Sequence, residues 1–302
     1  MSVPVLLVTG FLGAGKTTLI NGMLQAGHGL RIAAIVNDFG SINIDAALLE
    51  SASDSVIGLK NGCICCSLQG DLLRTLKQVL GSGSAPDLVV IEASGVADPG
   101  GIMQALMDPM IWQQASLEAV VCVVDALDAK LRKEDALWRA QLSQSDIVVL
   151  AKADGLESDA RTALTAQLGA MGKRHIYDAN EPLPLRTLLA QPRNPRAAPT
   201  TPIRDDRFVH LEWEHDGPVP LPAFQDTMTA LAPSLLRAKG FLQLAGREGA
   251  FTFQLVGQRA AMAPRPGQAG SGCQLVLIGE RATFDPEVAR ARLNAMVETG
   301  GA

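Results

Sequence analysis

The sequence predicts two units, an α/β domain with a mostly parallel sheet and then a smaller α+β domain. Over roughly the first 190 residues, short apolar runs alternate with segments that repeat apolar residues at helical spacing. This alternation is typical of a parallel sheet whose two faces are both covered by helices. Residues 191–206 are rich in proline and nearly free of large apolar side chains, so we expect a semi-rigid linker between domains at 1–190 and 207–302.

Each expected element rests on a local pattern. In the first domain the apolar runs predict strands at 3–8, 31–36, 88–91, 119–124 and 147–150. Helical spacing predicts helices at 18–24, 70–80, 100–107 and 159–171. In the second domain we expect a strand at 208–214, helices at 221–231 and 287–297, further strands near Phe241, Phe253 and Leu275, and a flexible hairpin loop over 264–272.

Composition excludes several classes of function. The net charge of −5 argues against binding to a nucleic-acid backbone, and an aromatic content of 4% leaves few side chains for stacking on bases. No apolar stretch reaches membrane-spanning length, and the start of the sequence shows neither a basic region nor a signal cleavage site. We therefore expect a cytoplasmic protein that binds neither nucleic acid nor a membrane.

Residues 10–17 read G-F-L-G-A-G-K-T between an apolar run and a helical pattern, which is the arrangement of a phosphate-binding loop. Successive backbone N–H groups of such a loop surround a phosphate, and the positive end of the following helix dipole adds to the attraction. We expect Lys16 to reach the β- and γ-phosphates and the Thr17 hydroxyl to bind Mg²⁺. The other residues expected to contact the nucleotide here are Gly10, Gly13, Ala14, Gly15 and Thr18.

Two further strands are followed by carboxylates. The run 87–92 ends in Glu92, which would hold Mg²⁺ directly or through water, and Gly95 then offers a backbone N–H for sensing a γ-phosphate. Asp38 follows the strand at 31–36 and is a candidate to position Mg²⁺ or the attacking water, with an ordinary Asx turn as the alternative. Lys16, Glu92 and Asp38 are the expected catalytic residues.

The sequence A-K-A-D at 151–154 predicts the base specificity. Lys152 can lie over a purine, and Asp154 can accept hydrogen bonds from the N1–H and 2-amino groups of guanine, which adenine does not offer. Ala151 stands where Asn or Thr is usual, and losing one neutral hydrogen bond costs about 1 kcal/mol, so the preference for GTP is weakened and not lost. A solvated Lys–Asp surface turn is the alternative.

Cys63, Cys65 and Cys66 form the sequence C-I-C-C after an Asn-Gly turn. They cannot all face a core, because alternate side chains point in opposite directions, and a disulfide between adjacent cysteines would be strained. Thiolates favour soft ions such as Zn²⁺, and three ligands leave an open position that suits metal transfer. A purely structural or redox role is the alternative, and the remaining thiols, Cys122 and Cys273, are expected to be small apolar side chains.

Together these motifs resemble the CobW-like family of metal-associated P-loop GTPases. The resemblance rests on G-F-L-G-A-G-K-T-T-L, N-D-F-G, G-C-I-C-C, E-A-S-G-V-A-D-P and A-K-A-D in this order, and on L-R-A-K-G-F at 236–241. It implies a P-loop NTPase domain followed by a CobW C-terminal-type domain, slow GTP hydrolysis with Mg²⁺, and zinc or cobalt at the three cysteines. The chain departs from the family in N-D-F-G-S for N-E-F-G-E, which places Ser41 at an acidic position, and in lacking a histidine-rich stretch.

The predicted function is therefore that of a GTP-hydrolysing metallochaperone that delivers a metal, zinc before cobalt, to a client metalloprotein. The alternative is a nucleotide-gated docking or maturation factor, of the cobalamin-synthesis or nitrile-hydratase type, in which the metal is structural. An ATP-using kinase is disfavoured by Asp154. Besides the client, further copies of the same chain are a candidate partner, which would make the protein a homo-oligomer.

Overall fold

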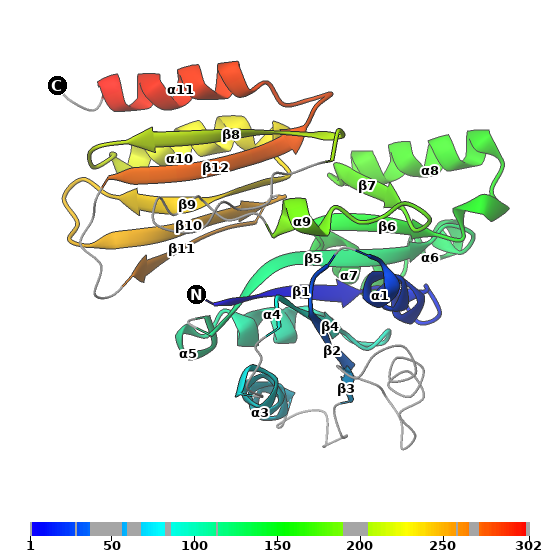
Figure 1. Ribbon diagram of the computed structural model, residues 1–302. Coiled ribbons are helices and arrows are strands. Elements are labelled where there is room, and N and C mark those ends of the chain that lie inside the picture. The colour runs from blue at the N-terminus through cyan, green and yellow to red at the C-terminus, as the bar shows by residue number, and fades with distance from the viewer. Residues whose placement is uncertain are drawn as a thin grey trace. The chain divides into compact units, whose positions relative to one another are not determined.

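The computed structural model describes residues 2–27, 29–36, 56–58, 68–81, 86–112, 114–189, 205–257, 259–265 and 272–299. The chain divides into two compact units, Met1–Leu183 and Pro184–Ala302 (Figure 1). Most of the expected linker at 191–206 lies outside the described residues, so its position and the domain boundaries drawn from it stay predictions.

The first unit is built on a sheet of seven parallel strands, which confirms the predicted α/β class. The strand order is β3-β2-β4-β1-β5-β6-β7, and each described pairing is parallel. The strands are β1 (Val3–Thr9), β2 (Ile32–Val36), β3 (Val56–Gly58), β4 (Leu88–Glu92), β5 (Ala115–Asp125), β6 (Ile147–Ala151) and β7 (His175–Asp178). Parallel strands of this kind carry their functional groups at the carboxyl ends.

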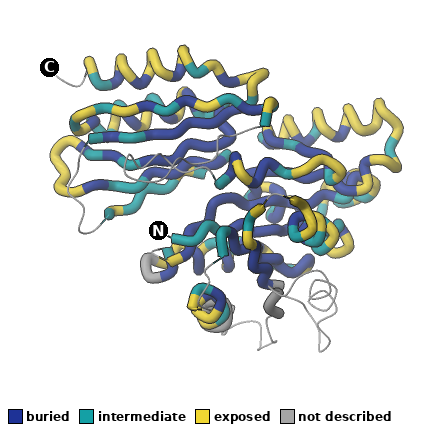
Figure 2. Tube along the Cα trace, in the orientation of Figure 1, coloured by how far each residue is buried: buried dark blue, intermediate teal, exposed yellow. Residues whose placement is uncertain are grey.

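Both faces of this sheet are buried, as Figure 2 shows for the dark central strands. Val5 and Leu7 of β1 share a core cluster with side chains of three helices. Leu6 and Val8 alternate with them and so point to the opposite face, yet each is at most 1% exposed. Burial on both faces is why these strands read as continuous apolar runs.

The helices of the first unit are α1 (Lys16–Gln25), α3 (Leu68–Gly81), α4 (Gly100–Leu106), α5 (Pro109–Trp112), α6 (Ala129–Arg132), α7 (Ala136–Ser143) and α8 (Ser158–Ala170), with a 3₁₀ turn η1 (Ala153–Gly155). The four expected helices are confirmed, with small shifts at their ends. Helix α7 was not expected. It begins at Asp135, whose carboxylate accepts the N–H of Trp138 at 3.0 Å.

Strand β5 begins earlier than its apolar run. Ser116 and Glu118 interrupt the pattern, yet both are buried, and the Ser116 hydroxyl donates a 2.8 Å hydrogen bond to the Glu118 carboxylate. The polar side chains thus satisfy each other inside the sheet, a pairing that hydropathy alone does not indicate.

The second unit is an α+β domain with an antiparallel sheet, as predicted. Its strands are β8 (Phe208–His215), β9 (Arg237–Gln243), β10 (Ala250–Val256), β11 (Arg259–Arg265) and β12 (Cys273–Glu280), in the order β11-β10-β9-β12-β8. Its helices are α9 (Leu185–Leu188), α10 (Leu221–Leu231) and α11 (Pro286–Thr299), with a 3₁₀ turn η2 (Ala232–Ser234). Trp213, Phe224, Phe253 and Leu293 belong to one core cluster between sheet and helices.

The expected hairpin loop at 264–272 was wrong at its start, because Pro264 and Arg265 belong to β11. Pro264 pairs with Phe251 of β10, and β11 is an edge strand, where the missing N–H of a proline is tolerated. The strand was overlooked because R-A-A-M-A-P-R contains no β-branched residue. Within the described parts of the chain, no helix combines the length and the apolar character needed to cross a bilayer.

Lys173, in the turn between α8 and β7, binds backbone carbonyl groups at and just beyond the end of α7. Its ammonium donates hydrogen bonds to the carbonyl oxygens of Ser143 at 3.1 Å and Ser145 at 2.7 Å, and the residue is 9% exposed. Burial lowers the pKa of Lys173. The Ser143 carbonyl ends α7, where no intrahelical donor is available, and Ser145 lies two residues beyond the helix.

We predict that Lys173→Met destabilises the protein by about 1–3 kcal/mol, since it keeps the apolar stem and leaves buried carbonyls unsatisfied. Urea unfolding followed by circular dichroism measures the change. Lys133→Met is the matched control, because Lys133 is exposed, and its effect should stay within about 0.5 kcal/mol. Equal stability of the two variants would contradict this role of Lys173.

Candidate functional site

The phosphate loop connects β1 to α1 and has a shape that requires glycine. Gly10 has a φ of 140°, and a Cβ atom there would lie 2.3 Å from the carbonyl oxygen of Val123 in β5. The loop then turns through a hydrogen bond from the Ala14 N–H to the Phe11 carbonyl at 3.1 Å, and α1 begins directly after Gly15. Strand β5 therefore restricts the loop from one side. The loop ends at the amino terminus of α1, where a helix favours a bound anion.

Lys16 is held by the loop itself. It is 6% exposed, and its ammonium donates to the carbonyl oxygens of Gly10 at 3.1 Å and Phe11 at 3.3 Å. The charge is thereby kept at the loop, where it can neutralise a bound phosphate.

Thr17 and Glu92 lie next to each other, as the sequence predicts for a shared magnesium site. The Thr17 hydroxyl is 3.1 Å and 3.3 Å from the two Glu92 carboxylate oxygens. The contact arises because β1 and β4 are neighbours, with Val8 paired to Glu92. A hydroxyl beside a buried carboxylate is a set of hard oxygen ligands, which fits Mg²⁺.

Gly95 brings the segment after β4 against the phosphate loop. A Cβ atom at Gly95 would lie 2.7 Å from Cα of Leu12 and 2.9 Å from Nζ of Lys16. Any side chain would therefore separate the two segments. The absence of a side chain at Gly95 is what lets the backbone after Glu92 reach the loop.

Lys152 bridges the phosphate loop and the end of β5. It adopts a left-handed backbone with a φ of 58°, and its ammonium donates to the Gly13 carbonyl at 3.0 Å and pairs with Asp125. Asp125 also accepts the N–H of Leu127 at 3.0 Å. Sequence reasoning missed Asp125, although it is a carboxylate at the end of an apolar strand, the same signal that identified Glu92.

Asp154 lies in η1 and is bound by Asn180, which follows β7. The Asn180 side-chain amide donates to both Asp154 carboxylate oxygens, at 3.1 Å and 2.9 Å. Asn180 is itself held by its N–H, which donates to Asp178 at 2.8 Å. Asn180 was also missed, and its signal is the polar Asp-Ala-Asn turn after a strand. Ala151 is buried beside the phosphate loop, 3.5 Å from the Cβ position of Gly15.

The strand order places these groups in one row along the carboxyl edge of the sheet. Glu92 ends β4, the phosphate loop follows β1, Asp125 ends β5, and Asp154 and Asn180 follow β6 and β7. Neighbouring strands lie about 4.8 Å apart, so the row spans about 19 Å. From Glu92 to Asp154 the row covers three of these spacings, about 14 Å, which suits an extended nucleotide with its phosphates near Glu92 and its base near Asp154.

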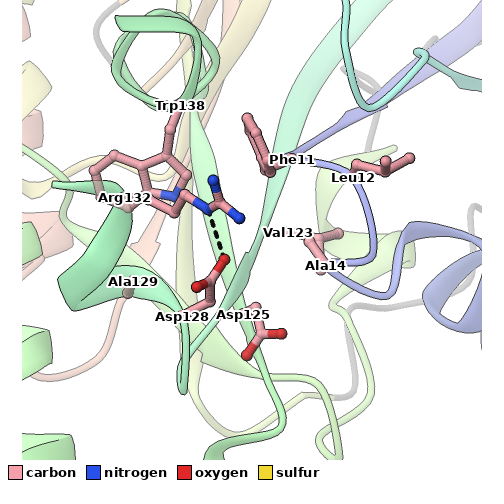
Figure 3. A pocket seen from close by; sticks show the side chains of 9 residues that line it. All are labelled: Phe11, Leu12, Ala14, Val123, Asp125, Asp128, Ala129, Arg132 and Trp138. Carbon is pink, nitrogen blue, oxygen red and sulfur yellow. Dashed lines mark hydrogen bonds and ion pairs between the residues drawn. The ribbon is translucent and has the colours of Figure 1, made fainter. Parts of the chain in front are cut away.

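A small hollow adjoins the phosphate loop (Figure 3). The Arg132 guanidinium lies 4.3 Å from the centroid of the Phe11 ring and donates a 2.7 Å hydrogen bond to Asp128. This cation–π contact supports the loop from the side of α6. The residues lining the hollow are Phe11, Leu12, Ala14, Val123, Asp125, Asp128, Ala129, Arg132 and Trp138.

Several predicted site residues lie outside the described part of the chain, namely Asp38, Ser41, Cys63, Cys65 and Cys66. Among the residues that the structure does describe, no group of three or more His, Cys, Asp or Glu is placed to hold a metal ion. Cys122 and Cys273 are both buried at 1% exposure, as expected for small apolar side chains.

Two family models match the chain. Residues 4–176 match the CobW/HypB/UreG nucleotide-binding domain, and residues 208–297 match the cobalamin synthesis protein cobW C-terminal domain. A zinc chaperone CobW of Sinorhizobium sp is 30% identical, over 98% of this chain and 97% of that protein. Zinc chaperone YjiA of Escherichia coli is 38% identical over 50% of each chain.

Zinc-regulated GTPase metalloprotein activator 1 of Schizosaccharomyces pombe is 32% identical over 52% of this chain and 41% of its own length. In sequence, the chain therefore matches half or less of the length of YjiA and of this activator, whereas it matches nearly all of the Sinorhizobium protein. Among solved structures, a zinc-bound triple mutant of YjiA GTPase aligns over 98% of this chain and 99% of its own, with a TM-score of 0.50 and 24% identity. That likeness shows the fold.

The buried thiols lead to a prediction for the five cysteines of the chain. Burial raises the pKa of Cys122 to about 12 and also raises that of Cys273, so both stay protonated and unreactive at neutral pH. In the folded protein, Ellman's reagent should react fast with the Cys63, Cys65 and Cys66 thiols alone, and in denaturant with all five. Cys273→Ala should lower only the denatured count. Fast reaction of Cys122 or Cys273 in the folded protein would contradict this.

Proposed function

Since the chain belongs to the CobW family of P-loop GTPases, we propose that it couples GTP hydrolysis to delivery of a transition metal, foremost zinc, to a client metalloprotein. The observation that carries the nucleotide half is the row of Glu92, the phosphate loop, Lys152 and Asp154 along one sheet edge. The metal half is supported by the C-I-C-C sequence and by relatives named zinc chaperones.

In this proposal the chain acts on GTP by positioning and charge neutralisation. The phosphate-loop N–H groups and Lys16 hold the β- and γ-phosphates at the start of α1. Thr17 and Glu92 would hold Mg²⁺, which when bound neutralises negative charge on the phosphates. Glu92, or Asp38 in the part of the chain that is not described, would orient the attacking water.

The base is read at the other end of the row. Asp154 accepts from the N1–H and 2-amino groups of guanine, and Lys152 lies beside the purine while tied to Gly13. The Ala151 methyl group offers no hydrogen bond to the base, so discrimination falls on Asp154.

The cargo metal is held by the thiolates of Cys63, Cys65 and Cys66 in our proposal, with zinc preferred and cobalt as the alternative. These cysteines lie in sequence between Asp38 and Glu92, the two carboxylates proposed at the phosphates. Loss of the γ-phosphate would reorder this stretch, weaken one thiolate ligand and release the metal to the client. The reduced thiols that this requires fit a cytoplasmic location.

Asp154→Asn tests the guanine site. The amide replaces an acceptor by a donor, so GTP affinity should fall roughly 100-fold, while xanthosine triphosphate, which has an oxygen in place of the 2-amino group, should become the preferred nucleotide. Competition with a fluorescent GTP analogue measures both. Asp159→Asn, an exposed carboxylate on α8, is the matched control. Unchanged GTP affinity in Asp154→Asn, or a preference of the parent for ATP, would overturn the assignment.

Cys65→Ser tests the metal site. Removing one of three thiolates should lower zinc affinity at least roughly tenfold while GTP affinity stays within about twofold. Competition with a chromophoric chelator gives the zinc affinity. The control Cys273→Ala removes a buried thiol and should bind zinc as the parent does. Equal zinc affinity in Cys65→Ser and the parent would exclude the three-thiolate site.

A further inference from the structure

Two glutamines of the α7 region fasten the segment that follows β4, residues 94–100. The Gln141 side-chain amide donates to the carbonyl oxygens of Gly95 at 3.3 Å and Ala97 at 3.1 Å. Directly after the helix, the Gln144 amide donates to the Asp98 carboxylate at 2.8 Å. The segment is thus attached to α7 at three points, although the partners lie more than forty residues apart in sequence.

The Gln141 side chain, which makes two of these three hydrogen bonds, is fully buried. Gln141 is 0% exposed, and its Oε1 atom is buried without a hydrogen-bond partner among the described residues. An apolar side chain of similar size would fill the same space without burying an unsatisfied oxygen. The amide is therefore explained by the two hydrogen bonds that it donates to the segment, and not by packing.

The same segment touches the phosphate loop on its other side. Gly95, whose carbonyl Gln141 holds, leaves no room for a methyl group against Leu12 and the Lys16 ammonium. Gly95 thus lies between a buried amide of α7 and the lysine of the phosphate loop. A displacement of the segment toward the loop is blocked by Leu12, and it would also lengthen the hydrogen bonds to Gln141.

We propose that Gln141 is a positioning residue that sets the 94–100 segment against the phosphate loop and so determines how well the protein distinguishes GTP from GDP. This inference rests on the proposed GTP chemistry. The segment follows Glu92, which lies beside Thr17 at the terminal-phosphate end of the row. Asp154 and Asn180, at the base end, follow β6 and β7, which lie three and four strands away from β4 in the sheet. Loss of Gln141 therefore acts on the triphosphate and leaves diphosphate binding intact.

The test is Gln141→Met, which keeps the length of the side chain and removes the donor. We expect kcat for GTP and the affinity for a non-hydrolysable GTP analogue each to fall roughly ten- to thirtyfold, the weight of two hydrogen bonds, with GDP affinity within about twofold of the parent. Leu142→Ala is the matched control. Leu142 is the neighbouring α7 residue, fully buried in the core, so its variant should lower the melting temperature and keep the ratio of the two affinities.

Four outcomes separate the possibilities. A Gln141→Met protein that melts earlier but keeps the parent's kcat and affinity ratio overturns the inference, and so does an equal loss of GTP and GDP affinity. If Gln141→Met does not fold, the partly exposed Gln144 provides a second variant, because Gln144→Met removes the hydrogen bond to Asp98 in the same segment. An unchanged ratio of GTP to GDP affinity in Gln144→Met also overturns the inference. A parent that neither binds nor hydrolyses GTP would instead remove the proposed function.

Discussion

The parallel register of the first sheet is the constraint on which the rest of this structure depends. Pairing Val8 with Glu92 and Asp125 with Ala151 brings the carboxyl ends of neighbouring strands to one edge. A slip of one residue in any strand would move each of its side chains to the opposite face of the sheet, out of the core in which that side chain packs. The slip would also displace the polar group at the end of the strand. The core therefore fixes the positions of the polar side chains, which lie in turns with little packing of their own.

The phosphate loop is shaped by neighbours from several strands. The backbone of Val123 in β5 closely approaches Gly10, and Gly95 after β4 closely approaches Leu12. Lys152 after β6 donates a hydrogen bond to the carbonyl oxygen of Gly13. A loop restrained on these sides keeps its N–H groups directed inward before a ligand arrives, which lowers the ordering cost of binding. The same restraints make it the point where a change at the terminal phosphate can be passed on, through Gly95 and Gln141, to α7.

Sequence reasoning identified the groups that stand in a recognisable motif or end an apolar strand, and it missed Asp125, Asn180 and Gln141. Lys16 and Thr17 stand in one motif, and the A-K-A-D sequence contains Lys152 and Asp154. Asp125 acquires its role from Lys152, 27 residues away, and Gln141 from Gly95, 46 residues away. The fold class was predictable because apolar runs report burial directly. The extra length of β5 and the edge strand β11 were not, since one hides a buried Ser–Glu pair and the other lacks β-branched residues.

We propose that the γ-phosphate and the three thiolates of Cys63, Cys65 and Cys66 are coupled. Zinc affinity measured by chelator competition, once with a non-hydrolysable GTP analogue and once with GDP, tests this coupling. The GDP form is expected to bind zinc at least roughly tenfold more weakly, a coupling of about 1.4 kcal/mol. Equal zinc affinity in the two forms would rule out the coupling and would favour a docking protein in which the metal only stabilises its loop.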